Sequence, residues 1–270
     1  MIILVYKEGG EKHCRPITSR EELIKACNSE ENVKNWKLYR QTGEEHYKHA
    51  LVQVCYNCQV SEGGLLKGVK TVSPFFFYDI DCRDREECRQ IISKLLKMRD
   101  ELGLVEVSES ASFGVHAVGL REPGKTILES QVRTSILTKT EMDTNNKENN
   151  RVVFHGPIND ETTPLLDETL FTKSLTDEEA AEEYKRLKER EKKGLEEVPA
   201  GAKKANKHYR PWEERTQETG DRSQETGDRS QESGDRSQES GVRSQESVRP
   251  HARPRWHRWR RLICVQSRRD

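Results

Sequence analysis

Apolar residues are scarce in this sequence, and no long hydrophobic run occurs in it. Hydrophobic types make up 32% of the 270 residues, whereas charged types make up 35%. A chain of this composition cannot bury enough apolar surface to pack from end to end, so we expect a substantial part of it to be disordered. No segment approaches the roughly 18 consecutive apolar residues that a membrane-spanning helix needs, so we expect no membrane partner.

A secretion leader is also missing. The chain starts Met1-Ile2-Ile3-Leu4-Val5-Tyr6 without a basic leader or a cleavage site, which predicts a first strand and a cytoplasmic protein. The seven cysteines are odd in number and irregularly spaced, as expected of reduced thiols in that compartment. The net charge is zero, so any argument for nucleic-acid binding has to come from local groups.

Apolar residues concentrate before about residue 172, and we expect residues 1–175 to form a single α/β domain. The strand at 73–81 contains a near-continuous aromatic run, which is typical of a strand buried on both faces. The alternation of strands and helices predicts a mixed sheet with flanking helices. Strand patterns cover 1–6, 50–56, 73–81, 104–107, 115–120 and 151–155; helix patterns follow Ser19, cover 83–102 and lie within 124–137.

Beyond residue 175 the sequence becomes polar and repetitive. A capping box, Thr176 with Glu179, and Glu–Lys pairs four residues apart predict an exposed charged helix in a linker region spanning 176–210. A seven-residue unit such as Arg222–Asp228 then repeats, without an apolar position for a coiled-coil seam and with glycines that oppose a helix. We expect residues 211–270 to be a disordered tail.

The end of this tail combines arginine with tryptophan. Between Arg249 and Arg269 there are eight arginines and no acid, together with Trp256 and Trp259. Arginine pairs phosphates and tryptophan stacks on bases, so this stretch fits a nucleic-acid-binding tail. The abrupt change of composition beside a repetitive tract also fits a tail without a selected function, and the sequence leaves both interpretations open.

Two aspartates stand at the end of the aromatic strand. Asp79 and Asp81 are two residues apart, so their side chains lie on one face of a strand. Carboxylates placed in this way repel each other unless a cation lies between them, and oxygen ligands suit Mg²⁺ or Mn²⁺. A strand end that runs into a solvated turn would show the same spacing.

A second motif, Ser110–His116, reads Ser-Ala-Ser-Phe-Gly-Val-His and predicts a turn of small residues that leads into a strand. Exposed backbone amides around Ser112 and Gly114 would hold phosphate oxygens, and the imidazole of His116 would bind a triphosphate. The alternative is a tight hairpin followed by an ordinary strand histidine.

Two further residues complete a set of motifs in a distinctive order. Asp143 supplies a third carboxylate about 60 residues after the first pair, and Arg151 precedes the strand at 152–154, where it would meet phosphate. The order Asp-x-Asp, a helix, Ser-x-Gly-x-His, a third Asp and Asn-Arg resembles the archaeo-eukaryotic primase-polymerase superfamily. Gly63–Gly68 and 166–171 look like the primase-like N-terminal domains of Bacteroides mobile-element and phage proteins, related to the VirE N-terminal family. The resemblance covers roughly residues 45–175.

The resemblance implies an RRM-like primase-polymerase core, the nucleotidyltransferase activity of a DNA primase, and roles for the matching residues. Single-stranded DNA and nucleotides are the implied partners, with a separate replicative helicase, because the chain has no Gly-x-x-x-x-Gly-Lys-Ser/Thr loop. Phe113 departs from the family pattern, which often has a basic residue before the second glycine of the turn. The implied metal-binding and catalytic residues are Asp79, Asp81 and Asp143, which bind Mg²⁺ or Mn²⁺; the implied nucleotide-binding residues are Ser112, Gly114, His116 and Arg151.

Other functions stay open on the same residues. A non-catalytic module of this fold would bind single-stranded DNA for replication or mobilisation without polymerising it. A glycosyltransferase would use Asp-x-Asp for the metal of a sugar nucleotide, although the Ser-x-Gly-x-His element argues against this. Cys55-x-x-Cys58 is half of a zinc site, with His46 and His49 at a spacing that no standard finger has, and ordinary thiols are the alternative.

Overall fold

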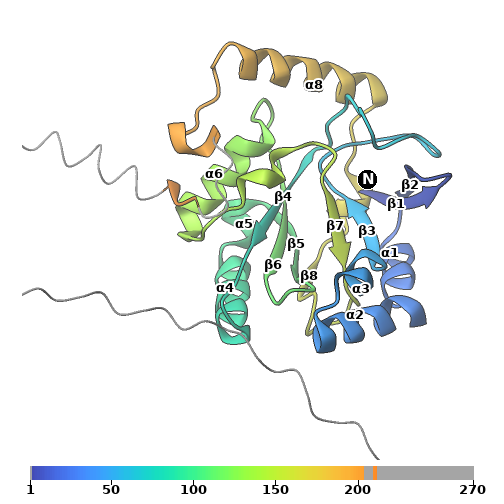
Figure 1. Cartoon of the computed structure of the whole chain (residues 1–270). Helices are drawn as coiled ribbons and strands as arrows, with labels where there is room; N and C mark the ends of the chain where they lie inside the picture. The colour runs from blue at the N-terminus through green and yellow to red at the C-terminus, as the bar shows by residue number, and fades with distance from the viewer. Residues whose placement is uncertain (1, 204–208, 212–270) are drawn as a thin grey trace, which may run out of the picture. The chain divides into compact units, whose positions relative to one another are not determined.

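The strands of the part of the chain that the structure describes form two four-stranded antiparallel sheets (Figure 1). The computed structural model describes residues 2–203 and 209–211, all within the unit Met1–Glu225. The first sheet has the strand order β2-β1-β3-β7, and the second has the order β4-β6-β5-β8. The expected disorder of 211–270 and the Arg/Trp-rich stretch lie outside the described residues, except for Pro211.

The first sheet is built on the hairpin of β1 (Ile2–Glu8) and β2 (Glu11–Ile17). Its two-residue turn, Gly9 and Gly10, has positive φ angles of 58° and 87°, which glycine adopts without steric cost. β3 (Val52–Cys55) pairs with β1, and β7 (Val152–His155) pairs with β3. Three helices lie between β2 and β3 in the chain: α1 (Arg20–Cys27), α2 (Glu30–Thr42) and α3 (Glu45–His49).

The second sheet contains a split β-α-β unit. β4 (Phe75–Ile80) is followed by α4 (Arg85–Lys97), α5 (Arg99–Leu102) and β5 (Leu104–Glu109), and β6 (Val115–Leu120) pairs between β4 and β5. This is the strand order of the first three strands of an RRM-like core. α6 (Ile127–Thr138) follows, and the short β8 (Leu165–Leu166) pairs with β5.

The α/β class with flanking helices is confirmed, but the strands form two antiparallel sheets in place of one mixed sheet. The difference arises at β7, which follows α6 in the chain and pairs with β3 rather than with β4. Val153 of β7 is buried against Ile2 and Val54 of the first sheet, so the apolar face of β7 is covered there. The hydrophobic pattern of a strand shows which face is buried, whereas its partner is set by distant residues.

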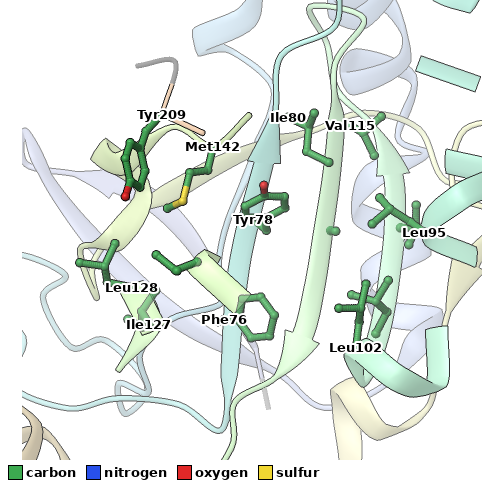
Figure 2. Packing of buried hydrophobic residues seen from close by; sticks show 14 of the residues in the cluster. Phe76, Tyr78, Ile80, Leu95, Leu102, Val115, Ile127, Leu128, Met142 and Tyr209 are labelled. Atoms are coloured by element: carbon green, nitrogen blue, oxygen red, sulfur yellow. The ribbon is translucent and has the colours of Figure 1, made fainter. Parts of the chain in front are cut away.

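The aromatic strand β4 is buried on both faces, as its sequence predicts. Phe76, Tyr78 and Ile80 point toward α4 and α6 and pack with residues such as Leu95 and Leu128 (Figure 2). Phe75 and Phe77 alternate to the opposite face and join the core that includes the first sheet. Burying each of these aromatic side chains is worth about 1.5–3 kcal/mol, so both cores depend on β4. Asp79 is the next alternate residue of β4, so its side chain lies on the same face of the strand as Phe75 and Phe77.

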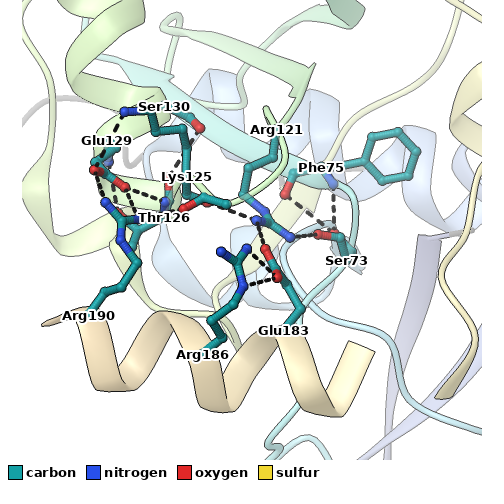
Figure 3. A network of polar contacts seen from close by, with 11 residues as sticks. Ser73, Phe75, Arg121, Lys125, Thr126, Glu129, Ser130, Glu183, Arg186 and Arg190 are labelled. Carbon is teal, nitrogen blue, oxygen red and sulfur yellow. Dashed lines mark hydrogen bonds and ion pairs between the residues drawn. The ribbon is translucent and has the colours of Figure 1, made fainter. Parts of the chain in front are cut away.

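The helix predicted after residue 175 is confirmed as α8 (Asp177–Lys192), with the capping box at Thr176 formed. Only Ala180 and Leu187 of this helix are buried, and ion pairs supply much of its attachment (Figure 3). The guanidinium groups of Arg121 and Arg190 lie 2.9 Å from the carboxylates of Glu183 and Glu129, respectively. The structure therefore has extensive contacts across residue 175.

Short helical segments complete the described chain: η1 (Thr144–Lys147), α7 (Thr169–Thr172) and η2 (Ala200–Lys203). Within residues 2–203 and 209–211, no helix combines the length and the apolar character needed to cross a bilayer.

Candidate active site

A cavity of about 880 Å³ lies beside the end of β4 and collects residues that are far apart in the sequence. They come from β4, the β5–β6 turn, β6, the segment before η1 and the segment before β7. The predicted site residues on the cavity wall are Asp79, Asp81, Ser112, His116, Asp143 and Arg151. Gly114 is the one predicted site residue that does not line the cavity; it lies in the β5–β6 turn.

Asp79 and His116 face each other because they are direct partners in the β4–β6 ladder. His116 Nε2 lies 3.7 Å from Asp79 Oδ1, and the edge of the imidazole packs against Phe77. Burial, followed by the charge of His155, lowers the pKa of His116 to about 3. His116 is therefore neutral at neutral pH, its contact with Asp79 is not an ion pair, and its ring offers one donor and one acceptor.

The three aspartates of the cavity wall repel one another. Burial, and then the charges of Asp81 and Asp143, raise the pKa of Asp79 to about 7, against the opposing effects of Arg151 and the Asn146 side chain. The Asp79 side chain is 25% exposed, so one part of it reaches the cavity. A divalent cation would relieve this repulsion, and carboxylate oxygens are the donors that Mg²⁺ and Mn²⁺ prefer.

The donor chemistry therefore fits Mg²⁺ or Mn²⁺. Over the described ranges, however, no three His, Cys, Asp or Glu side chains already form a metal-binding group. A metal site here would require a rearrangement that brings the carboxylate oxygens of Asp79, Asp81 and Asp143 toward a common point.

The turn before β6 is held tightly against the end of β4. The Gly114 amide donates to Ser110 Oγ at 2.8 Å, and the Phe113 amide donates to the Ser110 carbonyl at 3.2 Å. A Cβ on Gly114 would lie 2.5 Å from the Ile80 carbonyl oxygen, so only glycine allows this approach. Gly114 thus shapes the turn, while its amide already donates within the turn.

Phe113 of the same turn is packed against a cation. The Arg40 guanidinium lies 4.2 Å from the ring centre of Trp36 and 4.3 Å from that of Phe113, and it pairs with Glu109 at 2.9 Å. Arg40 also donates to the Ser110 carbonyl at 3.0 Å. Arg40 of α2 therefore holds the β5–β6 turn in place through contacts with Glu109, Ser110 and Phe113.

A lysine from α3 reaches the same turn on its cavity side. Lys48 Nζ lies 3.4 Å from Ser112 Oγ, which also contacts the Tyr39 hydroxyl at 3.1 Å. Lys48 lines the cavity, so a basic group stands beside Ser112 although the turn itself carries none.

Two more lysines on the wall were missed by the sequence analysis, Lys12 at the start of β2 and Lys67. Lys67 belongs to the glycine-containing loop, which docks along β2 through a hydrogen bond from the Leu66 amide to the Lys12 carbonyl at 3.0 Å. In a sequence with 47 lysines and arginines, no local signal distinguishes these residues. Their proximity depends on the docking of the loop.

The proposed zinc group does not assemble. Cys55 and Cys58 are buried, with their sulfur atoms 3.5 Å apart. His46 and His49 are mostly exposed on α3 and pair with Glu44 and Glu45. The cysteines lie in a small apolar core while the histidines face solvent, because no residue of α3 is buried.

Comparison of the chain with protein-family models, with curated proteins and with solved structures finds no match in any of the three. The chemistry of the cavity is therefore argued from its own side chains.

Proposed function

We propose that this chain is a primase-polymerase-like nucleotidyltransferase of a mobile element or phage. The observation that carries the proposal is the convergence of three carboxylates, a neutral histidine and an arginine from separate segments on one cavity. A solvated strand end and an ordinary strand histidine would not require Asp143 and Arg151 to join them. The resemblance in the order of the motifs gives independent support.

Each wall of the cavity has a role in this proposal. Asp79, Asp81 and Asp143 would hold Mg²⁺ or Mn²⁺, which, when bound, favours attack by a 3′ hydroxyl and stabilises the charge of the departing pyrophosphate. The neutral ring of His116 donates a hydrogen bond to a phosphate oxygen, and Arg151 binds phosphate through its guanidinium. In the overall reaction the 3′ hydroxyl releases its proton to water, its oxygen forms a bond to the α-phosphorus, and the bond from this phosphorus to pyrophosphate breaks.

The test is nucleotide incorporation, both by primer extension and de novo, with Mn²⁺ or Mg²⁺. We expect the wild type to incorporate nucleotides and His116→Ala to lose this activity, while the affinity for single-stranded DNA at fixed salt stays within a few-fold. Strand binding is distributed over many contacts, whereas nucleotide positioning depends on a few fixed donors. His46→Ala, an exposed histidine outside the cavity, is the matched control and should remain active. Full incorporation by His116→Ala would contradict the proposed site.

A second candidate, a non-catalytic module that binds single-stranded nucleic acid, is favoured by the basic residues of the wall. Lys12, Lys48 and Lys67 line the cavity together with the half-buried ring of Phe154. Cations beside an aromatic ring bind strands without any chemistry. In this case the wild type fails to incorporate nucleotides, while Lys12→Ala with Lys67→Ala weakens DNA binding and flattens its dependence on salt.

A further inference from the structure

A segment close to the end of the described chain pairs with the loop that carries Asp143. Met142 and Tyr209 form an antiparallel β-bridge, in which the Met142 amide donates to the Tyr209 carbonyl at 3.1 Å and the Tyr209 amide donates back at 3.4 Å. Both side chains are buried in one core, with Met142 1% and Tyr209 5% exposed (Figure 2). Arg210 adds an ion pair to Glu141.

This bridge lies between two other anchors of the same loop. On one side, the Tyr78 hydroxyl donates to the Thr140 carbonyl at 3.1 Å. On the other side, the Gln131 side-chain amide donates to the Asn146 carbonyl at 3.1 Å. Asp143 is adjacent to Met142, so the bridge to Tyr209 holds the backbone from which the third carboxylate reaches the cavity.

We propose that Tyr209–Pro211 is a strap that positions Asp143 relative to Asp79 and Asp81, and that the chain needs this strap to bind a divalent cation. The inference rests on the metal site of the proposed function. A carboxylate whose backbone moves by a fraction of an ångström loses its ligand geometry, so a contact outside the cavity controls affinity.

The experiment uses the full chain with Tyr209→Pro, which removes the amide that donates to Met142. Hydrogen exchange should show lost protection of the Met142 amide, while the amides of β4 and β6 stay protected. Calorimetric titration with Mn²⁺ alone should show a dissociation constant raised by about tenfold or more. The same substitution in an Asp143→Asn background should cause no further loss.

Arg89→Ala is the matched control, because it removes an exposed ion pair, to Glu86 on α4, that is part of neither the strap nor the cavity wall. It should bind Mn²⁺ nearly as the wild type does. If Tyr209→Pro fails to fold, Tyr209→Gly keeps the amide and removes the buried ring, and it should also raise the Mn²⁺ dissociation constant.

Unchanged protection of Met142, or unchanged Mn²⁺ affinity in a folded Tyr209→Pro protein, would overturn the inference. A wild type that binds no Mn²⁺ would overturn it as well. A wild type that binds Mn²⁺ in a strap-dependent manner but incorporates no nucleotide would contradict the proposed function and leave the strap supported, so the two failures are distinguishable.

Discussion

Two histidines near the cavity show how neighbours decide the state of a residue. Burial, and then the positive charge of His155, lower the pKa of His116 to about 3. His155 has both ring nitrogens against acceptors, with Nε2 at 3.0 Å from the Glu106 carboxylate and Nδ1 at 2.9 Å from the Gly156 carbonyl. Both nitrogens must therefore carry a proton, so His155 is an imidazolium in a buried ion pair.

Glu106→Gln tests this buried pair. Burial by itself lowers the pKa of His155, but Cys27 and Glu106 raise it well above the ordinary value. The pair therefore adds stability that is fully present between about pH 4.5 and 6.5, the ordinary pKa values of glutamate and histidine, and is lost as the pH rises through the folded-state pKa of His155 or falls through the lowered pKa of Glu106. Removing one partner leaves a buried charge and should cost about 3–5 kcal/mol at pH 6, with a smaller cost at higher pH. Urea denaturation of both proteins across this range measures the difference, and a cost that grows with pH would contradict the assignment.

Gly114→Ala tests the close contact between the β5–β6 turn and β4. The new Cβ would lie 2.5 Å from the Ile80 carbonyl oxygen, and a backbone atom cannot move aside cheaply. We expect the free energy of unfolding to fall by about 1–3 kcal/mol, as for other overpacked sites. Ser112→Ala is the control in the same turn, because its hydroxyl makes only peripheral contacts, and it should stay close to wild-type stability. Equal stabilities of the two variants in denaturant titrations would show that the turn is not pressed against β4.

At the scale of elements, the sequence predicts the strands and helices that have strong local signals. It does not predict which strand pairs with which. The aromatic run locates β4, and Ser19 marks the start of α1, where its hydroxyl accepts from the Glu22 amide. The hairpin strand β2 was missed, because its polar sequence lacks a clear alternation and the Gly9-Gly10 turn signal was not used. The pairing of β7 with β3 has no local signal at all.

The candidate site shows the same division. Carboxylates and a histidine stand out by type and spacing, so their convergence could be predicted from the order of the motifs. The cavity lysines, the contacts of Arg40 with the β5–β6 turn and the bridge of Met142 to Tyr209 depend on elements that meet only after folding.

The ion pair between Glu129 and Arg190 of α8 should make the free energy of unfolding fall at low pH. Burial would raise the pKa of Glu129, but hydrogen bonds from Arg190 and from the Glu197 and Thr126 amides lower it to about 2. The contribution is thus present above about pH 4.5 and is lost as the pH falls toward 2, with a size of about 2–3 kcal/mol. Glu129→Gln should flatten the stability curve between pH 5 and pH 2. Thermal melts in this range measure it, and Glu178→Gln, an exposed position on α8, should keep the wild-type acid dependence.

For the whole molecule, the sequence predicts a domain that ends at residue 175, and the described contacts continue beyond that point. Arg121 and Glu129 are 8% and 5% exposed, respectively, and each has its ion-pair partner on α8. Ala202 and Tyr209 add apolar contacts to the core that contains β4. A chain cut at 175 would keep both sheets but lose all of these partners.

The last prediction compares two truncations with the full chain. Residues 1–175 should unfold with a free energy lowered by about 3–5 kcal/mol or more, because buried Arg121 and Glu129 lose their charge partners. Residues 1–211 should match the full chain, since the polar sequence from 212 onward has too few apolar residues to add packing. Chemical denaturation of the three proteins, followed by fluorescence and circular dichroism, measures this order. Equal stability of 1–175 and 1–211 would place the domain boundary at 175, whereas a full chain that is more stable than 1–211 would show that the repeats contribute to the fold.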